Sequence, residues 1–285
     1  MKKILTVMLL AACCCSLGAQ TASSLFWRKD SLQVSEIKSK EAVQYNFVGH
    51  HGPAVENVAS AFRIYFNDSG AIDVYSKSGK MMELAKYHWY PTEAQQKNEG
   101  AGCDEYMVGK TVGLGGIALW DGTQVVKLVA TGGRTARVGK TSDGSYAEMI
   151  AYGVECGNEK YDVSIRVDVY DGSRIAKVTA SELNGRKVRF VTGVNYHAGE
   201  TVSVGKNYLW AWGVHPADVA SDPQPLGAGM FFNRKDFSKK MKTDDMLMLI
   251  SKPCSSLSTR IVAASTMEDE LNDVEKFGNY MQEKH

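Results

Sequence analysis

Short runs in which apolar and polar residues alternate constrain this chain more than any other feature. The clearest run, Asp162–Val169, alternates at a strict period of two, which places one face of a strand on a core and the other in water. Glycine-rich turn signals such as Asp171-Gly172 and Asn184-Gly185 recur about every eight to twelve residues, a spacing typical of a sandwich or barrel. We therefore predict a mainly β protein with an antiparallel β-sandwich. A large, supersandwich-like form is included in this prediction.

Two segments have the pattern of β-hairpins. Phe62–Phe66 is strand-like, ends at the turn of residues 67–70 and is followed by the alternating run Ala71–Tyr75. The dipeptide Asp121-Gly122 also separates two apolar runs, which is a strong hairpin signal. Antiparallel neighbours are therefore expected along most of the chain.

Helical periodicity is concentrated at the C-terminus. Leu271, Val274, Phe277 and Tyr280 recur every three residues after a capping-box pattern at Thr266, so we expect an amphipathic helix near residues 267–282. A second, short helix is expected after Pro91, because proline is tolerated at a helix start. Repeats and linkers are not apparent, and we predict an N-terminal arm over residues 21–44 and a single sandwich domain over residues 45–285.

The first twenty residues predict export. A short basic start, Met1-Lys2-Lys3, precedes the apolar run Ile4–Leu10 and small residues up to Ala19, a pattern typical of a secretory signal over residues 1–20 and too short for a spanning helix. Cleavage there would give a periplasmic protein. The alternative is a lipoprotein anchored at Cys13, because Leu10-Ala11-Ala12-Cys13 resembles a lipoprotein box.

The charge and the cysteine content of the chain limit the kinds of partner and metal that it is expected to bind. The 33 basic residues nearly balance the 32 acidic residues, so no overall field favours nucleic acid or an anionic membrane. Beyond the signal region the cysteines are Cys103, Cys156 and Cys254, which form no CxxC pair and predict no cysteine-based zinc site. A Cys103–Cys156 disulfide and three free thiols remain the two alternatives. No cofactor is predicted.

Gly49-His50-His51-Gly52-Pro53 is the densest candidate for chemistry. Histidine moves protons near neutral pH or binds metal, and flanking glycines let a ligand approach the backbone. A metal would need a third ligand brought in by the fold, and we predict none. The plain alternative is a structural turn. Asn57, shortly after the motif, is a further candidate for substrate binding.

Aromatic residues next to histidines form a second group of candidates. Trp89 and Tyr90 follow His88, and aromatic rings can stack on the faces of sugars. Trp210 and Trp212 lie two apart and therefore share one face of a strand, where tryptophans usually belong to the core. Strand ends close to these positions carry further candidate residues, namely Tyr196, His197 and His215.

Several familiar catalytic motifs are missing from the sequence. It contains neither GxSxG nor HExxH, and Gly113–Gly116 lacks the lysine and hydroxyl of a phosphate-binding loop. The acidic pairs Asp104-Glu105 and Asp244-Asp245 are predicted to be solvated loop charges.

The motifs around these candidates resemble a known family. Gly49–Asn57, Arg63–Phe66 and Trp210–Val219 are similar to exported proteins of gut and marine Bacteroidetes, catalogued as domain of unknown function four-eight-six-one, and the similarity covers roughly residues 45 to 281. The resemblance implies a place among glycan-degrading enzymes, often those acting on uronic-acid polysaccharides. It also implies elimination on uronate-containing oligosaccharides, by a lyase or a dehydratase.

Elimination from a uronate needs a neutralised carboxylate, a base for the C5 proton and an acid for the leaving oxygen. We predict Arg63 as the carboxylate clamp, placed beside the histidine loop by strand pairing. His51 or His197 is the predicted base, and Tyr90 or Tyr196 the predicted acid. The remaining candidates are predicted to bind the oligosaccharide: His50, Asn57, Trp89, Tyr196, Trp210 and His215.

Two other functions remain open at this point. One is a carbohydrate-binding β-sandwich without catalysis, with Trp89, Tyr90 and Trp210 as its platform. The other is a glycosidase, which needs a pair of carboxylates, and Glu56 with Asp104 is the pair nearest to the histidines.

Overall fold

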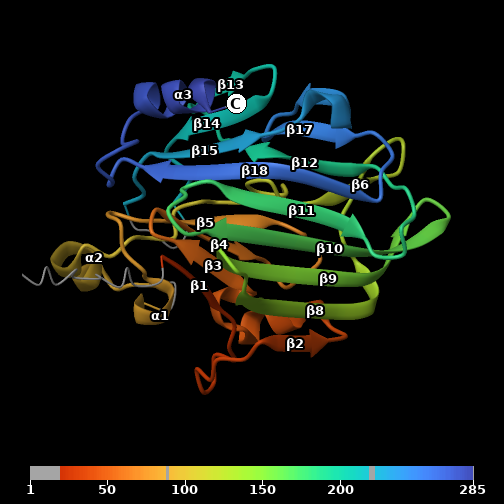
Figure 1. Cartoon of the computed structure of the whole chain (residues 1–285), viewed down its shortest axis with the longest axis horizontal. Helices are drawn as coiled ribbons and strands as arrows, with labels where there is room; N and C mark the ends of the chain where they lie inside the picture. The colour runs from red at the N-terminus through yellow and green to blue at the C-terminus, as the bar shows by residue number, and fades with distance from the viewer. Residues whose placement is uncertain (1–19, 88–89, 218–221, 285) are drawn as a thin grey trace, which may run out of the picture.

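The computed structural model describes residues 20–87, 90–217 and 222–284. Their strands form three antiparallel sheets. In Figure 1 the long strands β8 to β11 and β18 lie one above another across the molecule. The predicted antiparallel β architecture is confirmed.

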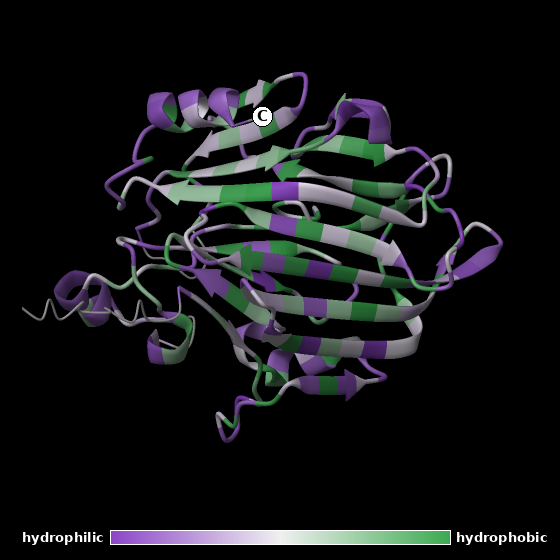
Figure 2. Cartoon of the chain, viewed as in Figure 1, coloured by the Kyte–Doolittle hydropathy of each residue, from purple (hydrophilic) through white to green (hydrophobic). Residues whose placement is uncertain are grey.

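The largest sheet has nine strands. In spatial order they are β13 (Thr201–Val204), β14 (Tyr208–Gly213), β15 (Leu226–Phe231), β18 (Ser256–Ser265), β11 (Ala176–Glu182), β10 (Glu159–Tyr170), β9 (Gly144–Cys156), β8 (Ala130–Lys140) and β2 (Glu36–Ser39). The predicted alternation holds in β10, where Val163 and Ile165 are fully buried while Arg166 lies on the other face. Figure 2 shows the resulting bands of hydrophobic and hydrophilic residues along these strands.

Two smaller sheets form the second layer. The four-stranded sheet has the order β1 (Thr21–Ser24), β3 (Ala54–Asn57), β4 (Ser60–Ile64) and β5 (Ile72–Ser76). The five-stranded sheet has the order β16 (Phe237–Lys242), β17 (Met246–Ser251), β12 (Phe190–Asn195), β6 (Ala118–Trp120) and β7 (Val125–Val126).

Residues 112–117 connect the two smaller sheets. The Ile72 amide donates to the Val112 carbonyl at 3.1 Å, and the Gly115 amide donates to the Gly193 carbonyl at 2.8 Å. Side chains of all three sheets, among them Phe62, Phe190 and Ile165, then pack in one apolar cluster. The layers therefore enclose one core, as expected for a sandwich.

The N-terminal segment belongs to the sheets. β1 pairs with β3, and β2 pairs with β8, while Leu25 between them is fully buried. The arm predicted over residues 21–44 is therefore corrected: the sandwich begins at β1. Strands of four residues contain too few alternations to be recognised in a sequence.

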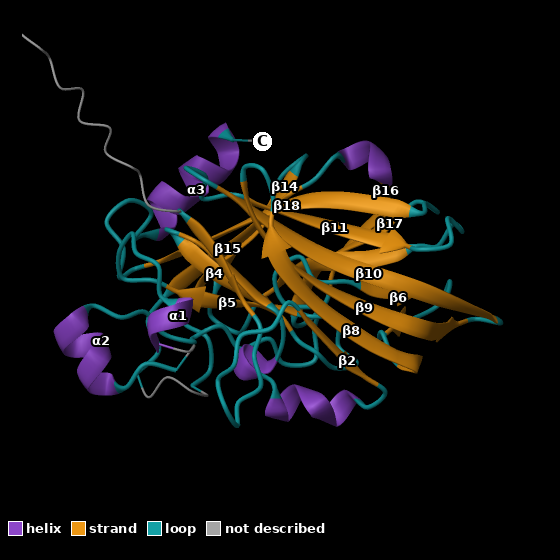
Figure 3. Cartoon of the chain, turned by 60° about the horizontal axis from the view of Figure 1, so that its bottom comes forward, coloured by secondary structure: helices purple, strands orange, loops and turns teal. Residues whose placement is uncertain are grey.

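The helices lie at the periphery of the strand layers (Figure 3). They are α1 (Leu84–Tyr87), α2 (Glu93–Glu99), α3 (Val274–Glu283) and the 3₁₀ turns η1 (Ala42–Phe47), η2 (Gly49–His51) and η3 (Arg234–Asp236). The C-terminal helix is confirmed, but it begins at residue 274 because Asp273, not Thr266, caps it by accepting from the Lys276 amide at 2.8 Å. In the described part of the chain, none of the helices combines the length and apolarity required to cross a bilayer.

Cys103, Cys156 and Cys254 are free. Cys103 pairs through its backbone with Ser76, whereas Cys156 packs in the core at the end of β9. Of the two alternatives that the sequence allowed, the Cys103–Cys156 disulfide is therefore not formed, and the three free thiols are.

Candidate functional site

A polar cleft of about 530 Å³ opens beside the four-stranded sheet. Its walls come from η1, η2, β4, β5 and the segment of residues 104–109, which contacts both smaller sheets. The lining residues are Tyr45, His51, Arg63, Tyr65, Asn67, Ser69, Asp73, Tyr90, Asp104, Glu105, Tyr106, Met107, Val108, Gly109, Lys127, Pro216 and Pro223. Three predicted site residues, His51, Arg63 and Tyr90, therefore meet in one cleft.

His51 enters the cleft from a tight left-handed turn. Its backbone has φ +58°, an uncommon conformation for a residue with a side chain. Gly52 follows it, and a Cβ atom at that position would lie 2.0 Å from the Ile64 carbonyl oxygen. The Gly-His-His-Gly motif thus fits a loop packed closely on β4, and the packing aims the imidazole.

His51 is a neutral imidazole at physiological pH. Burial, together with the positive charges of Arg63 and Arg28, lowers the pKa of His51 to about 4. Its Nδ1 lies 3.2 Å from the Tyr45 carbonyl oxygen, so Nδ1 carries the proton and donates it there. The lone pair of Nε2 can therefore accept a proton, as a general base requires.

Arg63 lies next to the histidine loop as predicted, because β4 pairs Arg63 with Ala54 of β3. Its guanidinium, however, is bound by protein carboxylates. Nε donates to Asp73 Oδ2 at 2.8 Å and Nη2 donates to Asp104 Oδ2 at 2.7 Å. Burial alone would lower the pKa of Arg63, but these two carboxylates raise it well above its usual value. The buried fork is thus occupied, and Arg63 positions other groups instead of clamping a substrate carboxylate.

Tyr90 depends on Arg63 for its orientation. Nη1 of Arg63 donates to the Tyr90 hydroxyl at 3.1 Å, which leaves the hydroxyl proton of Tyr90 free to point elsewhere. The rings of His51 and Tyr90 lie 6.2 Å apart between centroids. Burial raises the pKa of Tyr90 above its usual value, so the hydroxyl stays protonated at neutral pH and can donate.

Glu105 is a site residue that the sequence prediction missed. It is 5% exposed, and its Oε1 accepts from the Gln224 amide at 2.9 Å. Within the described residues its Oε2 has no hydrogen-bond partner. Burial raises the pKa of Glu105 to about 7, so a large share of the molecules carry a proton on this acid at neutral pH.

The prediction that Asp104 and Glu105 are solvated is therefore wrong. Backbone hydrogen bonds between Cys103 and Ser76 attach the segment to β5 and carry it inward. The sequence signal for this burial was the apolar residues that flank the two acids. These residues, Cys103, Tyr106 and Val108, are all buried.

His197 and His215 lie behind the cleft wall, on the far side of Met107. His197 Nε2 is 2.9 Å from the Met107 carbonyl oxygen, and the Met107 amide donates to His215 Nδ1 at 3.0 Å. Asn195 Nδ2 donates to the same carbonyl at 2.8 Å. The two imidazole rings are 4.5 Å apart between centroids. His197 is thus bound to the backbone and does not line the cleft, and we no longer assign it as the base.

Four predicted binding residues have structural contacts outside the cleft, namely His50, Trp210, Tyr196 and Asn57. His50 is buried against Ser24 Oγ at 2.9 Å. Trp210 packs on Phe277 beneath α3. The Tyr196 hydroxyl donates to the Thr243 carbonyl. Trp89 lies outside the described residues.

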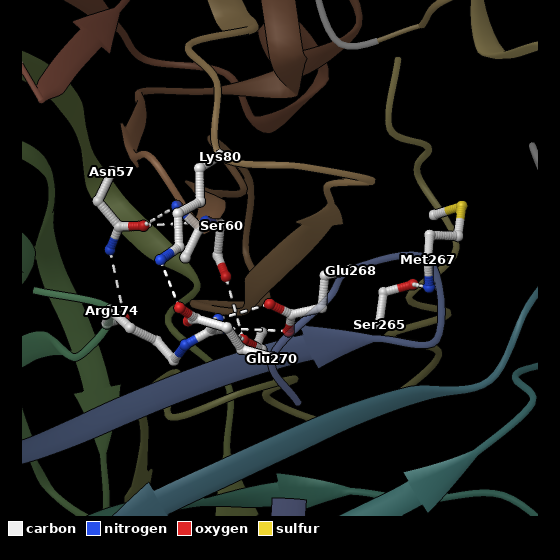
Figure 4. Close-up of polar contacts among 10 residues, drawn as sticks. Asn57, Ser60, Lys80, Arg174, Ser265, Met267, Glu268 and Glu270 are labelled. Atoms are coloured by element: carbon white, nitrogen blue, oxygen red, sulfur yellow. Dashed lines mark hydrogen bonds and ion pairs between the residues drawn. The ribbon is translucent and has the colours of Figure 1, made fainter. Parts of the chain in front are cut away.

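Asn57, the fourth of these residues, holds a turn together. Its Oδ1 accepts from the amides of Ala59 and Ser60 at 2.9 Å, and its Nδ2 donates to the Arg174 carbonyl at 3.2 Å. Figure 4 shows this contact beside the ion pairs that join Arg174 to Glu268 and Glu270. Asn57 therefore belongs to the network that fixes the C-terminal segment.

The carboxylate pair considered for a glycosidase is divided between two environments. Glu56 is fully buried, accepts from Lys77 Nζ at 2.6 Å and also binds the amides of Glu83 and Leu84. Asp104 lines the cleft and is paired with Arg63. Glu56 is thus a structural anchor for the segment before α1.

The fold and the cleft define a β-sandwich protein with a buried polar site. The chain belongs to the family described as Domain of unknown function (DUF4861), whose model matches residues 17–285. Among solved structures it is similar to a 4-alpha-glucanotransferase from Thermococcus litoralis, with 10% identity and a TM-score of 0.36 over 81% of this chain and 42% of that chain. The chain thus spans less than half of that structure. No curated protein gives a significant match.

Proposed function

We propose that this protein eliminates a group from C4 of a uronate within an oligosaccharide, as a lyase or a dehydratase. The observation that carries the proposal is one cleft that holds a neutral imidazole and two acids whose pKa values are raised. His51 is the base, and Tyr90 and Glu105 are the candidate acids. Such pairs, whose surroundings push their pKa values in opposite directions, are typical of acid–base sites.

The reaction balances with these groups. His51 Nε2 takes the C5 proton, the C4–oxygen bond breaks, and Tyr90 or Glu105 gives the departing oxygen a proton as the C4–C5 double bond forms. Loss of a sugar would make the enzyme a lyase, and loss of water a dehydratase. The new double bond absorbs in the ultraviolet.

The substrate carboxylate needs a cation that is not already paired. Lys127 lines the cleft and is exposed, and Arg28 lies at its rim with Cζ 5.9 Å from the Tyr90 ring centroid. In the described part of the chain neither of them forms an ion pair with a carboxylate. We therefore assign carboxylate neutralisation to Lys127 and Arg28 in place of Arg63.

A binding module without catalysis is the second candidate, and the tyrosines of the cleft favour it. Tyr45, Tyr65, Tyr90 and Tyr106 all line the cleft, and the three that are partly exposed, Tyr45, Tyr65 and Tyr90, offer hydroxyls and ring faces to a sugar. The experiment is to incubate purified protein with a panel of uronate oligosaccharides, following ultraviolet absorbance and product masses. Rising absorbance supports elimination; binding with unchanged masses supports the module; new reducing ends without absorbance would indicate a hydrolase.

Export completes the proposal. We propose that residues 1–20 direct the chain to the periplasm, with lipidation at Cys13 as the alternative. Detection of the intact N-terminus in the cytosol would contradict export, and Cys13-dependent palmitate labelling would select the lipoprotein.

A further inference from the structure

His197, Glu200 and His215 converge at one end of the sheet. His197 and Glu200 are the first and last residues of the tight turn that leads into β13, where the Glu200 amide donates to the His197 carbonyl at 3.2 Å. β13 pairs with β14, bringing Thr201 opposite Trp212, so His215, just after β14, arrives beside Glu200. The pairing of two strands thus places two imidazoles and a carboxylate together.

The nitrogen and oxygen atoms of this cluster are spaced for a metal ion. One ligand atom from each residue lies within 4.8 Å of the others, and His215 Nε2 is 3.5 Å from Glu200 Oε1. Ligands at zinc bond lengths in a tetrahedral site are about 3.4 Å apart. The Glu200–His215 distance already fits, and only a modest contraction is needed at His197.

The second observation is the state of the Glu200 carboxylate. Its side chain is 1% exposed, and within the described residues neither oxygen has a hydrogen-bond donor. It also has no lysine or arginine partner there. A buried carboxylate needs a proton or a cation, and in the described part of the chain the titratable side chains near it are His197, His215 and Tyr106.

We propose that His197, Glu200 and His215 bind one divalent transition-metal ion of the zinc class. Two imidazoles and one carboxylate form a donor set that suits zinc and related ions, whereas magnesium and calcium prefer oxygen ligands alone. The fourth position is left for water or another group. This site is separate from the base and acids of the proposed elimination.

The surroundings of His197 prepare it for this role. Its Nε2 lies 2.9 Å from the Met107 carbonyl and donates to it, which leaves the lone pair of Nδ1 for a metal. A metal-bound histidine usually donates its second nitrogen to a carbonyl or carboxylate in this way, fixing the ring.

His215 must change its tautomer on binding. The Met107 amide donates to Nδ1 of His215, so in the metal-free ring the proton sits on Nε2. A metal on Nε2 moves this proton to Nδ1 and displaces the Met107 amide from its acceptor. The loss of one such hydrogen bond is small beside the binding free energy of a structural zinc site. Loading is therefore coupled to Met107, a residue of the cleft wall.

The test is zinc binding to the full chain after treatment with a chelator. Titration with Zn²⁺ is followed by calorimetry and by metal analysis of the desalted protein. We expect the wild type to bind one zinc ion per chain. Glu200→Gln should bind zinc about 100-fold more weakly or worse, because even loss of an outer partner of a ligand costs about 10- to 100-fold. Glu105→Gln removes another buried carboxyl and should leave zinc binding unchanged. Zinc held by the free cysteines would appear equally in all variants.

NMR spectra of the histidine ring nitrogens give a second, independent readout of zinc binding. Zn²⁺ should move the His215 proton from Nε2 to Nδ1, whereas Mg²⁺ should have no effect. His215→Ala should also abolish zinc binding, and if this variant fails to fold, Glu200→Gln and the His215 spectrum still decide the question. Equal zinc affinity in the wild type and Glu200→Gln, or an unchanged His215 spectrum at saturating zinc, overturns the proposal. Neither result bears on elimination in the cleft, so the two proposals fail separately.

Discussion

Two kinds of buried carboxylate occur in this protein. Glu56 and Asp73 have cationic partners, because Glu56 Oε2 accepts from Lys77 Nζ at 2.6 Å and Asp73 Oδ2 accepts from Arg63 Nε at 2.8 Å. Glu105 and Glu200 have no such partner among the described residues, and Glu200 has no hydrogen-bond donor at either oxygen. All four side chains are nearly inaccessible to solvent.

The difference between the two kinds lies in what neutralises the charge. A paired carboxylate organises the chain around it, as Glu56 does before α1. An unpaired one holds its proton to higher pH, and burial raises the pKa of both Glu105 and Glu200 to about 7. We infer that Glu56 and Asp73 serve the fold, whereas Glu105 and Glu200 carry chemistry.

The largest expected effect comes from breaking a pair. Lys77→Met removes the cation and leaves Glu56 buried and unpaired, which should lower the free energy of unfolding by about 3–5 kcal/mol. Denaturant titration measures it. Lys80→Met is the matched control, because its pair with Glu270 is more than half exposed on both sides and should cost less than about 1 kcal/mol. Similar losses in both variants would contradict the distinction.

Glu105 should make stability depend on pH. Its pKa is raised from 4.5 to about 7 in the folded protein, so the folded state keeps a proton that the unfolded chain releases. The stabilisation is complete below pH 4.5 and is lost as the pH rises to about 7, amounting to roughly 3 kcal/mol at most. Glu105→Gln should remove this dependence in unfolding measured at pH 5 and pH 8. An identical pH slope in both proteins would show that Glu105 has an ordinary pKa.

The sequence predicted the features that depend on local order. Period-two runs located most long strands, Pro91-Thr92 marked α2, and strand pairing placed Arg63 beside the Gly-His-His-Gly motif. The two kinds of carboxylate were indistinguishable, because the fold supplies their neighbours. Glu105 accepts from Gln224, which is 119 positions away, and Glu200 meets His215 only through the pairing of β13 with β14. Only the fold determines which acid meets a cation.

The pH dependence of the reaction should identify the acid. The rate should fall below pH 4 as His51 becomes protonated, because the pKa of His51 is about 4. If Glu105 is the acid, the rate also falls about tenfold per pH unit above pH 7, and Glu105→Gln abolishes that limb along with most of the rate. A rate that stays level above pH 7 in the wild type assigns the acid role to Tyr90.

The smallest expected effect concerns the unpaired cation at the cleft. Lys127→Ala should raise KM for a uronate substrate by about tenfold and change the stability little, because the side chain is exposed. A neutral oligosaccharide of the same length is the comparison substrate, since it has no carboxylate to lose. An unchanged KM would place the substrate carboxylate elsewhere, with Arg28 as the remaining cation.

Two adjacent histidines allow the most direct test of His51 as the base. His50 and His51 both have left-handed backbones, which asparagine tolerates, but only His51 lines the cleft. The measurement is the rate at which ultraviolet absorbance rises on a uronate oligosaccharide, per folded molecule. We expect a loss of about 100-fold or more for His51→Asn and nearly the wild-type rate for His50→Asn. Full activity in His51→Asn, or equal losses in both variants, would contradict this role of His51.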